Sequence, residues 1–166
     1  MSRLFLLRHA KAAWAKPGER DFDRPLQYSG ETDSRTTGAE MAAKGLIPAT
    51  VLCSTARRAR ETWLGVSQEL GIAADDAIYL GELYSTDGAG YLKLVRAAAP
   101  ADTMLVIGHN PMMEDLAEAL SGKADPAARA ALEAGFPTAG LAVISFAGPL
   151  SEAAPGGGHL EQFLAR

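Results

Sequence analysis

Two of the three histidines in this chain of 166 residues stand where short apolar segments end. His9 follows Arg8 and the apolar residues 4–7, and His109 follows a second such segment and precedes Asn110. An Arg–His pair at the end of a buried strand is costly unless something pairs with it. A histidine just before a helix lies where the first N–H groups of that helix favour an anion. The competing interpretation is structural, with Arg8 paired to a carboxylate and the histidines bonded to loop backbone.

Arg58 and Glu82 stand near the ends of two further segments of this kind. Arg58 falls in the first turn of a predicted helix, where a cation opposes the helix dipole and therefore requires an anion nearby. Glu82 is placed to donate a proton to a leaving group, although a surface carboxylate would give the same pattern. A neutral imidazole is a competent nucleophile toward phosphorus, and arginine stabilises charge on phosphoryl oxygens. The combination therefore favours phosphoryl transfer.

Other phosphate and metal chemistries lack their motifs. The chain has no GxxxxGK(S/T) or GxGxxG segment, which excludes nucleotide-binding loops of these kinds. A cysteine phosphatase loop would need Arg where Ala59 stands after Cys53, so Cys53 is expected in the core. One cysteine excludes an intrachain disulfide, and no HExxH segment or spaced carboxylate cluster predicts a metal site. We therefore expect neither a metal nor a cofactor.

Apolar periodicity predicts the elements that must position these side chains. Residues 122–137 are Ala-rich and irregular, with room for one short helix, and residues 159–164 are expected to form a short edge strand. Strands alternating with helices predict an α/β fold with a largely parallel sheet, whose strands end at one edge where sites form. The expected central strands are 4–7, 50–53, 77–80, 103–107 and 141–146, and the expected helices are 31–44, 56–70, 91–99 and 111–120.

The composition is that of one soluble globular domain over residues 1–166. Apolar residues make up 48% and charged residues 22% of the chain. The net charge of −4 argues against general binding to nucleic acid or to an anionic membrane. No segment has the apolar length of a signal peptide or a membrane span, so we expect a cytoplasmic protein.

Three segments carry a family resemblance. Residues 6–11, LLRHAK, resemble the Arg-His-Gly/Ala signature of the histidine phosphatase superfamily. Residues 54–62, STARRARET, are similar to its second motif, Ser-Pro-x-x-Arg-Ala-x-Gln/Glu-Thr. Residues 106–111, VIGHNP, resemble the segment that holds its second essential histidine. The RHAK opening together with residues 21–26, DFDRPL, resembles the short SixA-type phosphohistidine phosphatases.

This resemblance implies a phosphoglycerate mutase-like fold, a three-layer α/β/α sandwich around a mostly parallel sheet. It also implies that His9 is the nucleophile and is phosphorylated transiently. Glu82 lies where larger relatives place their proton donor, although SixA-type sequences vary there. The residues expected to bind the phosphoryl group are Arg8, Arg58, His109 and Asn110.

The chain departs from the family pattern at several positions. Thr55 replaces the usual Pro of the second motif, which we expect to alter loop stiffness more than chemistry. Ala12 and Ala13 stand where polar residues often follow the first motif, and Ala15 where mutase-like members have an Asn of the phosphate pocket. These losses disfavour sugar-phosphate mutase activity and leave open a reduced activity. Arg24 either adds to a basic rim or forms a loop salt bridge.

The expected function is a metal-independent phosphatase that hydrolyses phosphohistidine on a protein, such as a histidine-containing phosphotransfer domain. Glu82 comes 24 residues after Arg58, and His109 comes 27 residues after Glu82, which leaves no room for a lid over the site. A monomer with an open site would accept a folded phosphoprotein. One alternative is a phosphatase of a small phosphorylated metabolite or phosphoserine. Another is a non-catalytic phosphoprotein-binding module, against which the two histidines argue.

Overall fold

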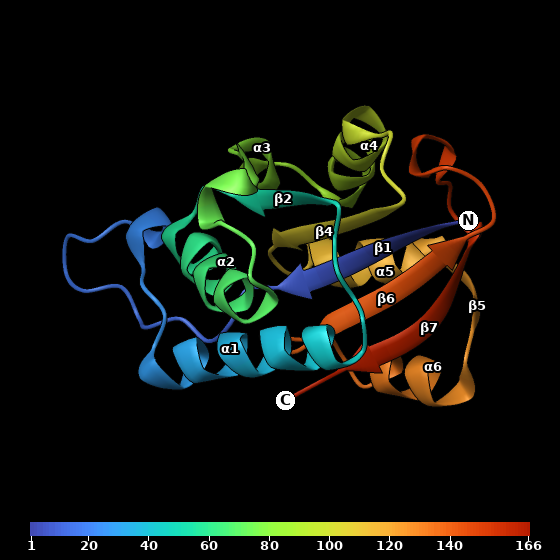
Figure 1. Cartoon of the computed structure of the whole chain (residues 1–166). Helices are drawn as coiled ribbons and strands as arrows, with labels where there is room; N and C mark the ends of the chain where they lie inside the picture. The colour runs from blue at the N-terminus through green and yellow to red at the C-terminus, as the bar shows by residue number, and fades with distance from the viewer.

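Seven strands form one sheet in the computed structural model, which describes residues 1–166. The strands are β1 (Ser2–Arg8), β2 (Thr50–Ser54), β3 (Ile78–Leu80), β4 (Thr103–Gly108), β5 (Ser121–Ala124), β6 (Leu141–Phe146) and β7 (Gly158–Leu164). Their order across the sheet is β3-β2-β4-β1-β6-β7-β5 (Figure 1). The pairs β3–β2, β2–β4, β4–β1 and β7–β5 are parallel, whereas β6 is antiparallel to both β1 and β7. The mostly parallel sheet expected from the sequence is confirmed.

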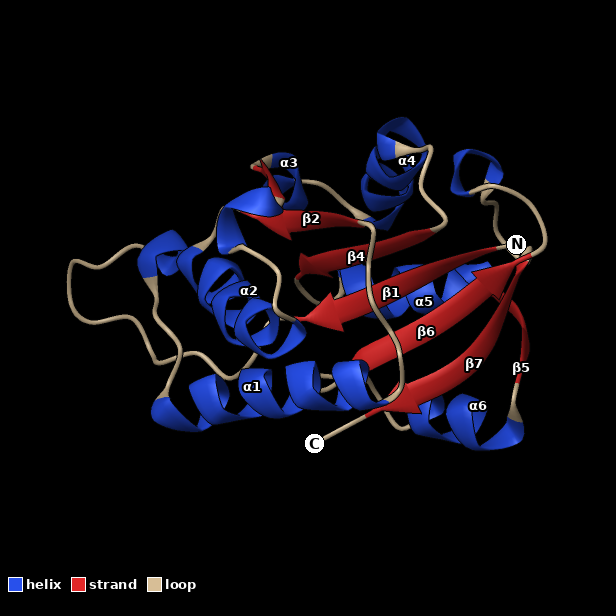
Figure 2. Ribbon diagram, viewed as in Figure 1, coloured by secondary structure: helices blue, strands red, loops and turns tan.

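Helices cover both faces of this sheet (Figure 2). They are α1 (Tyr28–Ala43), α2 (Arg57–Leu70), α3 (Glu82–Ser85), α4 (Gly88–Ala98), α5 (Met112–Leu120) and α6 (Pro126–Glu133). One buried cluster joins the sheet to α1 and α2, and a second joins its other face to α4, α5 and α6. Alternate side chains of β1 face opposite sides of the sheet, so both faces are apolar. Leu4 and Leu6 belong to one cluster, and Phe5 and Leu7 belong to the other. The three-layer α/β/α architecture is therefore confirmed.

Strand register brings the predicted site residues together. β1 and β4 are parallel neighbours with Leu7 opposite Ile107 and Arg8 opposite Gly108. The N–H of His9 then donates to the carbonyl of Gly108 at 3.0 Å, which continues the ladder one step past the strand. His9 and His109 therefore follow the last paired residues of two adjacent strands and lie side by side at the edge of the sheet. β2 pairs with the other side of β4, so its carboxyl end lies at the same edge.

Three details of the predicted elements are wrong. The strand β7 does not lie at the edge, because β5 pairs with its outer side. All of β5 but Ser121 falls within the stretch expected to be irregular, since Ser121–Ala124 has none of the apolar alternation that marks a strand. The one-turn helix α3 was not expected either, because four residues give no periodicity to detect. None of the helices combines the length and apolar character that crossing a bilayer requires.

Candidate active site

The carboxyl ends of β1, β2 and β4 meet at one edge of the sheet (Figure 1), and three predicted site residues lie together there. His9, Arg58 and His109 are each no more than 9% exposed. The ring centroids of the two histidines are 5.2 Å apart. The first turn of α2 contains no acidic residue, so the Arg58 cation is not neutralised by its own helix.

His9 is held in one tautomer by two partners. Its Nδ1 lies 2.7 Å from the carbonyl oxygen of Ala10, which can only accept, so Nδ1 carries the proton. Its Nε2 lies 3.3 Å from the Nε–H of Arg58, which can only donate, so Nε2 carries the lone pair. Burial lowers the pKa of His9 to about 4, and the positive charges of Arg58, Arg8 and Arg24 also lower it. The ring is therefore neutral at pH 7, with its nucleophilic nitrogen directed at a cation.

Arg58 spans the space between His9 and the loop that precedes α1. Its Nη1 donates to the carbonyl of Asp21 at 2.8 Å, and its Nη2 donates to the carboxylate Oδ2 of Asp21 at 3.1 Å. Thr62, one turn further along α2, donates its hydroxyl to the carbonyl of Arg58 at 2.7 Å and accepts the N–H of Ala10 at 2.9 Å. Thr62 therefore fixes the start of α2 against the residue that follows His9.

His109 offers a ring nitrogen that no protein group uses. Its Nε2 contacts the hydroxyl of Ser54 at 2.8 Å, whereas its Nδ1 is buried without a hydrogen-bond partner. Burial is the main cause that lowers the pKa of His109 to about 3, and nearby His9 and Arg58 contribute to the same shift. Tyr91 holds the backbone here, because its hydroxyl accepts the N–H of His109 at 3.2 Å and donates to the carbonyl of Leu83. A buried polar atom without a partner is costly, so this nitrogen is suited to a ligand.

Arg8 and Asn110 share one backbone acceptor. The Nη1 of Arg8 donates to the carbonyl of Phe136 at 2.8 Å, and the Nδ2 of Asn110 donates to the same oxygen at 3.2 Å. Arg8 forms no ion pair, and its Nε is buried without a partner. The structural interpretation in which Arg8 pairs with a carboxylate is therefore wrong.

Asp21 and Tyr84 border the site, although neither is among the site residues expected from the sequence. The Asp21 carboxylate accepts from Arg58, from Arg24 Nη1 at 2.9 Å and from the hydroxyl of Tyr84 at 2.8 Å. Partial burial raises the pKa of Asp21, but these bonds and the Arg58 charge outweigh it and lower the pKa to about 2. Arg24 pairs with Asp21 and also donates to the carbonyl of Ala13 at 2.8 Å. Of the two interpretations of Arg24, a basic rim or a loop salt bridge, the structure shows the salt bridge.

Glu82 is separate from this network. It is the first residue of α3, its side chain is exposed, and it forms no side-chain hydrogen bond or ion pair. Its neighbour Tyr84 packs edge-on against His109 with ring centroids 5.5 Å apart. The signal that could have pointed to Asp21 was its place in DFDRPL, whereas nothing in the sequence marked Tyr84.

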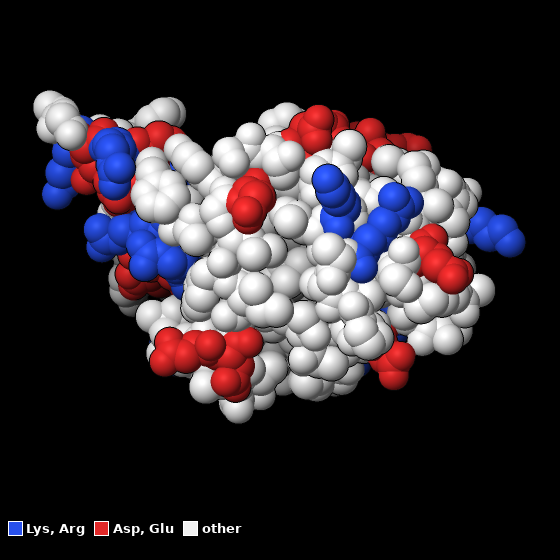
Figure 3. Space-filling model, turned by 90° about the horizontal axis from the view of Figure 1, so that it is seen from above, with Lys and Arg blue, Asp and Glu red and all other residues white.

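The charges around the site are mixed. Lys and Arg gather together with Asp and Glu at the end of the molecule that carries the loop between β1 and α1 (Figure 3). Inside the site the balance is positive, because Arg58 and Arg24 share the carboxylate of Asp21 while Arg8 lies near only that of Glu114. No group of three His, Cys, Asp or Glu side chains is placed to hold a metal ion. The arrangement is that of an anion site next to a nucleophilic imidazole.

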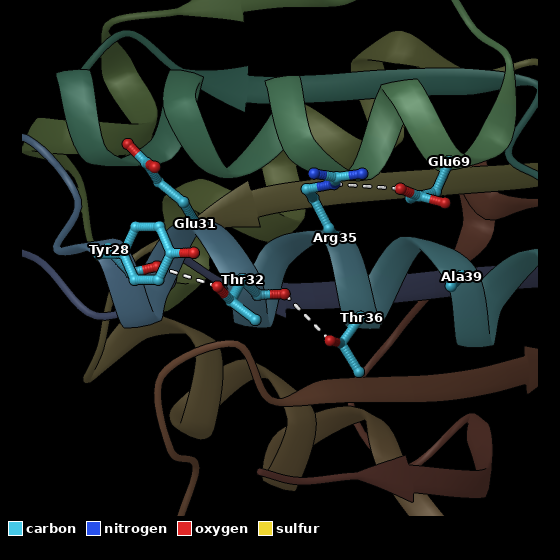
Figure 4. A pocket seen from close by; sticks show the side chains of 7 residues that line it. All are labelled: Tyr28, Glu31, Thr32, Arg35, Thr36, Ala39 and Glu69. Carbon is cyan, nitrogen blue, oxygen red and sulfur yellow. Dashed lines mark hydrogen bonds and ion pairs between the residues drawn. The ribbon is translucent and has the colours of Figure 1, made fainter.

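A hollow of about 360 Å³ elsewhere on the surface offers no comparable chemistry. It lies along the faces of α1 and α2, where Arg35 and Glu69 form an ion pair at 3.2 Å (Figure 4). The hydroxyls of Thr32 and Thr36 donate to carbonyls one turn earlier in α1. The hollow contains no histidine or cysteine that could act as a nucleophile.

Comparisons with known proteins agree with this geometry. The family described as the histidine phosphatase superfamily (branch 1) matches residues 4–87. An uncharacterized protein of Mycobacterium tuberculosis is 35% identical over 153 residues, which cover 90% of this chain and 93% of that protein. These two findings place most of the chain in a known family.

Two solved structures extend the likeness. A crystal structure from Agrobacterium tumefaciens, provisionally assigned as phosphohistidine phosphatase SixA, matches with a TM-score of 0.82 and 39% identity over 99% of both chains. The protein histidine phosphatase SixA complexed with tungstate matches with a TM-score of 0.74 and 25% identity, covering 98% of this chain and 96% of the other. The chain belongs to branch 1 of the histidine phosphatase superfamily and has a SixA-type structure.

Proposed function

We propose that the protein is a metal-independent phosphatase that removes the phosphoryl group from phosphohistidine on a protein, with His9 as the nucleophile. The tautomer of His9 carries the proposal, because its Nδ1–H is fixed on the carbonyl of Ala10 and its Nε2 lone pair faces the anion site. The superfamily supports phosphatase activity. The structural relatives named as phosphohistidine or protein histidine phosphatases support this substrate class.

In the proposed reaction, Nε2 of His9 attacks phosphorus while the bond to the leaving group breaks and its electron pair stays with the leaving atom. Arg8, Arg58 and His109 hold the phosphoryl oxygens, and stabilising their charge supplies most of the catalysis. The unpartnered atoms Arg8 Nε and His109 Nδ1 are suited to this task. Water then attacks the phosphorylated His9, which releases phosphate and restores the imidazole. Asn110 is anchored on the same carbonyl as Arg8, that of Phe136, and we assign it to the phosphate-binding residues beside Arg8.

The openness of the site supports a protein substrate. The side chain of Asp21 is 52% exposed, while that of Arg58, which it contacts, is 8% exposed, so the site is open to solvent on the side of Asp21. A phosphohistidine projecting from a folded partner, such as a histidine-containing phosphotransfer domain, would reach Arg58 without a lid having to open. We also propose that the protein acts as a monomer in the cytoplasm.

The decisive experiment incubates the purified protein with a phosphorylated histidine-containing phosphotransfer domain in a metal chelator and measures phosphate release. We expect release by the native protein and none by His9→Ala, with acid-labile phosphate trapped on His9 during turnover. Hydrolysis of a small phosphomonoester but not of the phosphoprotein would favour a metabolite phosphatase. Binding of the phosphoprotein without release or trapping would make the chain a binding module.

A further inference from the structure

Asp21 lies on the solvent-exposed side of the site. His9 Nε2 and the Asp21 carboxylate contact the Nε and Nη2 atoms of the same guanidinium, that of Arg58. Phosphoryl transfer places the attacking and leaving atoms roughly in line on opposite sides of phosphorus. His9 is buried and Asp21 is half-exposed, so a group attached to the rest of a substrate must extend from phosphorus toward Asp21.

The Asp21 carboxylate can accept one more hydrogen bond. An ionised carboxylate has about four acceptor positions. Arg24 uses one on Oδ1, while Arg58 and Tyr84 use those on Oδ2. The position that remains is on Oδ1, and the charges facing it are those of Arg24 and Arg58. Asp21 stays ionised because these partners hold its pKa near 2, so it accepts protons in hydrogen bonds and does not donate one.

We propose that Asp21 selects substrates whose leaving group carries an N–H directed outward, as the ring of protonated phosphohistidine does. This inference rests on the proposed function and names the leaving-group chemistry that its site prefers. The distal ring nitrogen of a phosphoimidazolium is a cationic N–H donor, and such charge-assisted bonds to a carboxylate are strong. An ester of an alcohol or phenol presents no such donor there.

The bond changes balance without a proton donor. The bond from phosphorus to the ring nitrogen breaks, and its electron pair remains on that nitrogen while the bond to His9 Nε2 forms. The ring arrives as a cation with its distal N–H on Asp21 and leaves as neutral imidazole with the same N–H. An exposed Glu82 outside the hydrogen-bond network is consistent with this chemistry. The ring of Tyr84, which lies beside the Arg58 guanidinium with 5.7 Å from Cζ to its centroid, supplies a flat wall for a flat leaving group.

The test compares Asp21→Asn with Asp23→Asn on two small substrates, phosphoimidazole and p-nitrophenyl phosphate. Asp23 is the matched control, because its carboxylate pairs only with the exposed Arg20. For Asp21→Asn we expect the ratio of kcat/KM for phosphoimidazole over p-nitrophenyl phosphate to fall by about tenfold or more, given the strength of hydrogen bonds to charged groups. Asp23→Asn should keep the native ratio. An equal loss on both substrates would overturn the proposal, because Asp21 would then only hold Arg58 in place.

A second pair of substrates separates this proposal from the proposed function. Aryl phosphates with a para aminomethyl or a para carboxylate group differ in the charge that they present outward. Asp21→Asn should lower the preference for the cationic ester over the anionic one. If the native protein hydrolyses aryl phosphates but not phosphoimidazole, the proposed function fails while this comparison still decides the role of Asp21. An unchanged preference in this pair would refute that role.

Discussion

The Nε–H of Arg58 lies 3.3 Å from Nε2 of His9, so the cation and the nucleophilic nitrogen are joined by one hydrogen bond. A phosphoryl group that reaches His9 must enter between these two atoms. The guanidinium keeps further N–H groups on Nη1 and Nη2 besides those bound to Asp21, and these are available to phosphoryl oxygens. Arg58 and His9 are therefore already in place, and the two side chains need to move only slightly apart to admit the anion.

Replacing Arg58 with lysine tests this relationship. Lysine keeps the positive charge but loses the planar fork that reaches His9 and Asp21 together. We expect kcat/KM toward p-nitrophenyl phosphate to fall by about a hundredfold or more, the usual effect of removing one charge-stabilising donor. Arg57→Lys is the matched control, because Arg57 is exposed and pairs only with Glu61. Equal activities of the two variants would show that Arg58 does not bind the phosphoryl group.

Acid should destabilise the fold before carboxylates begin to titrate. Burial lowers the pKa of His9 to about 4 and that of His109 to about 3, from an ordinary value of 6.5. Between pH 6.5 and 4 the unfolded chain therefore binds more protons than the folded one, so stability is full above pH 6.5 and falls as the pH drops. Asp21 adds its loss below this window, between its ordinary pKa of 3.8 and the folded value of about 2.

The melting temperature measured from pH 7 to pH 4.5 checks this expectation. We expect a steady fall for the native protein and a shallower one for His109→Gln, which removes one of the buried imidazoles. A native melting temperature that stays level across this range would contradict the neutral state assigned to both rings.

Gly30 tests how the segment after His9 is supported. A Cβ on this residue of α1 would overlap the carbonyl of Lys11, which accepts the N–H of Gln27 at 2.9 Å. We expect Gly30→Ala to cost about 1–3 kcal/mol of unfolding free energy, the usual range for overpacking, and to lower activity by displacing the chain beside His9. Urea denaturation measures the first effect. Gly88→Ala is the control, since a Cβ there meets neighbours only at ordinary contact distances of 3.5 Å and beyond.

The central part of the fold could be predicted because its strands are unbroken apolar runs. Leu4–Leu7 is buried on both faces, and burial of this kind leaves little room for polar residues. The edge strand β5 could not be predicted, because Ser121–Ala124 lacks the apolar residues of a strand. It forms a strand by pairing with β7. Its structure depends on a neighbour distant in sequence, which local pattern does not reveal.

The residues of the site likewise divide into those that the sequence pattern predicts and those that it does not. His9, His109 and Arg58 could be placed together because each follows a strand of one parallel sheet. Asp21 and Tyr84 could not, because a long loop and a one-turn helix bring them in, and neither has periodicity that predicts its position. The role of Tyr91, whose hydroxyl anchors the backbone, could not be predicted for another reason. Its side chain lies on a buried helix face whose sequence pattern is that of ordinary core.

Glu82→Gln separates the two kinds of leaving group. Glu82 remains the predicted proton donor, and its exposed position at the start of α3 leaves its carboxyl free of partners. An alkoxide leaves phosphorus only with a proton, whereas a protonated imidazole leaves as a neutral ring. We therefore expect Glu82→Gln to lower kcat/KM for phosphoserine by about a hundredfold relative to that for phosphoimidazole, within the usual range for acid catalysis. Parallel assays of both substrates, with the exposed Glu118→Gln as the control, provide the measurement. An unchanged ratio would remove Glu82 from the reaction, and the protein would then be suited to leaving groups that bring their own proton.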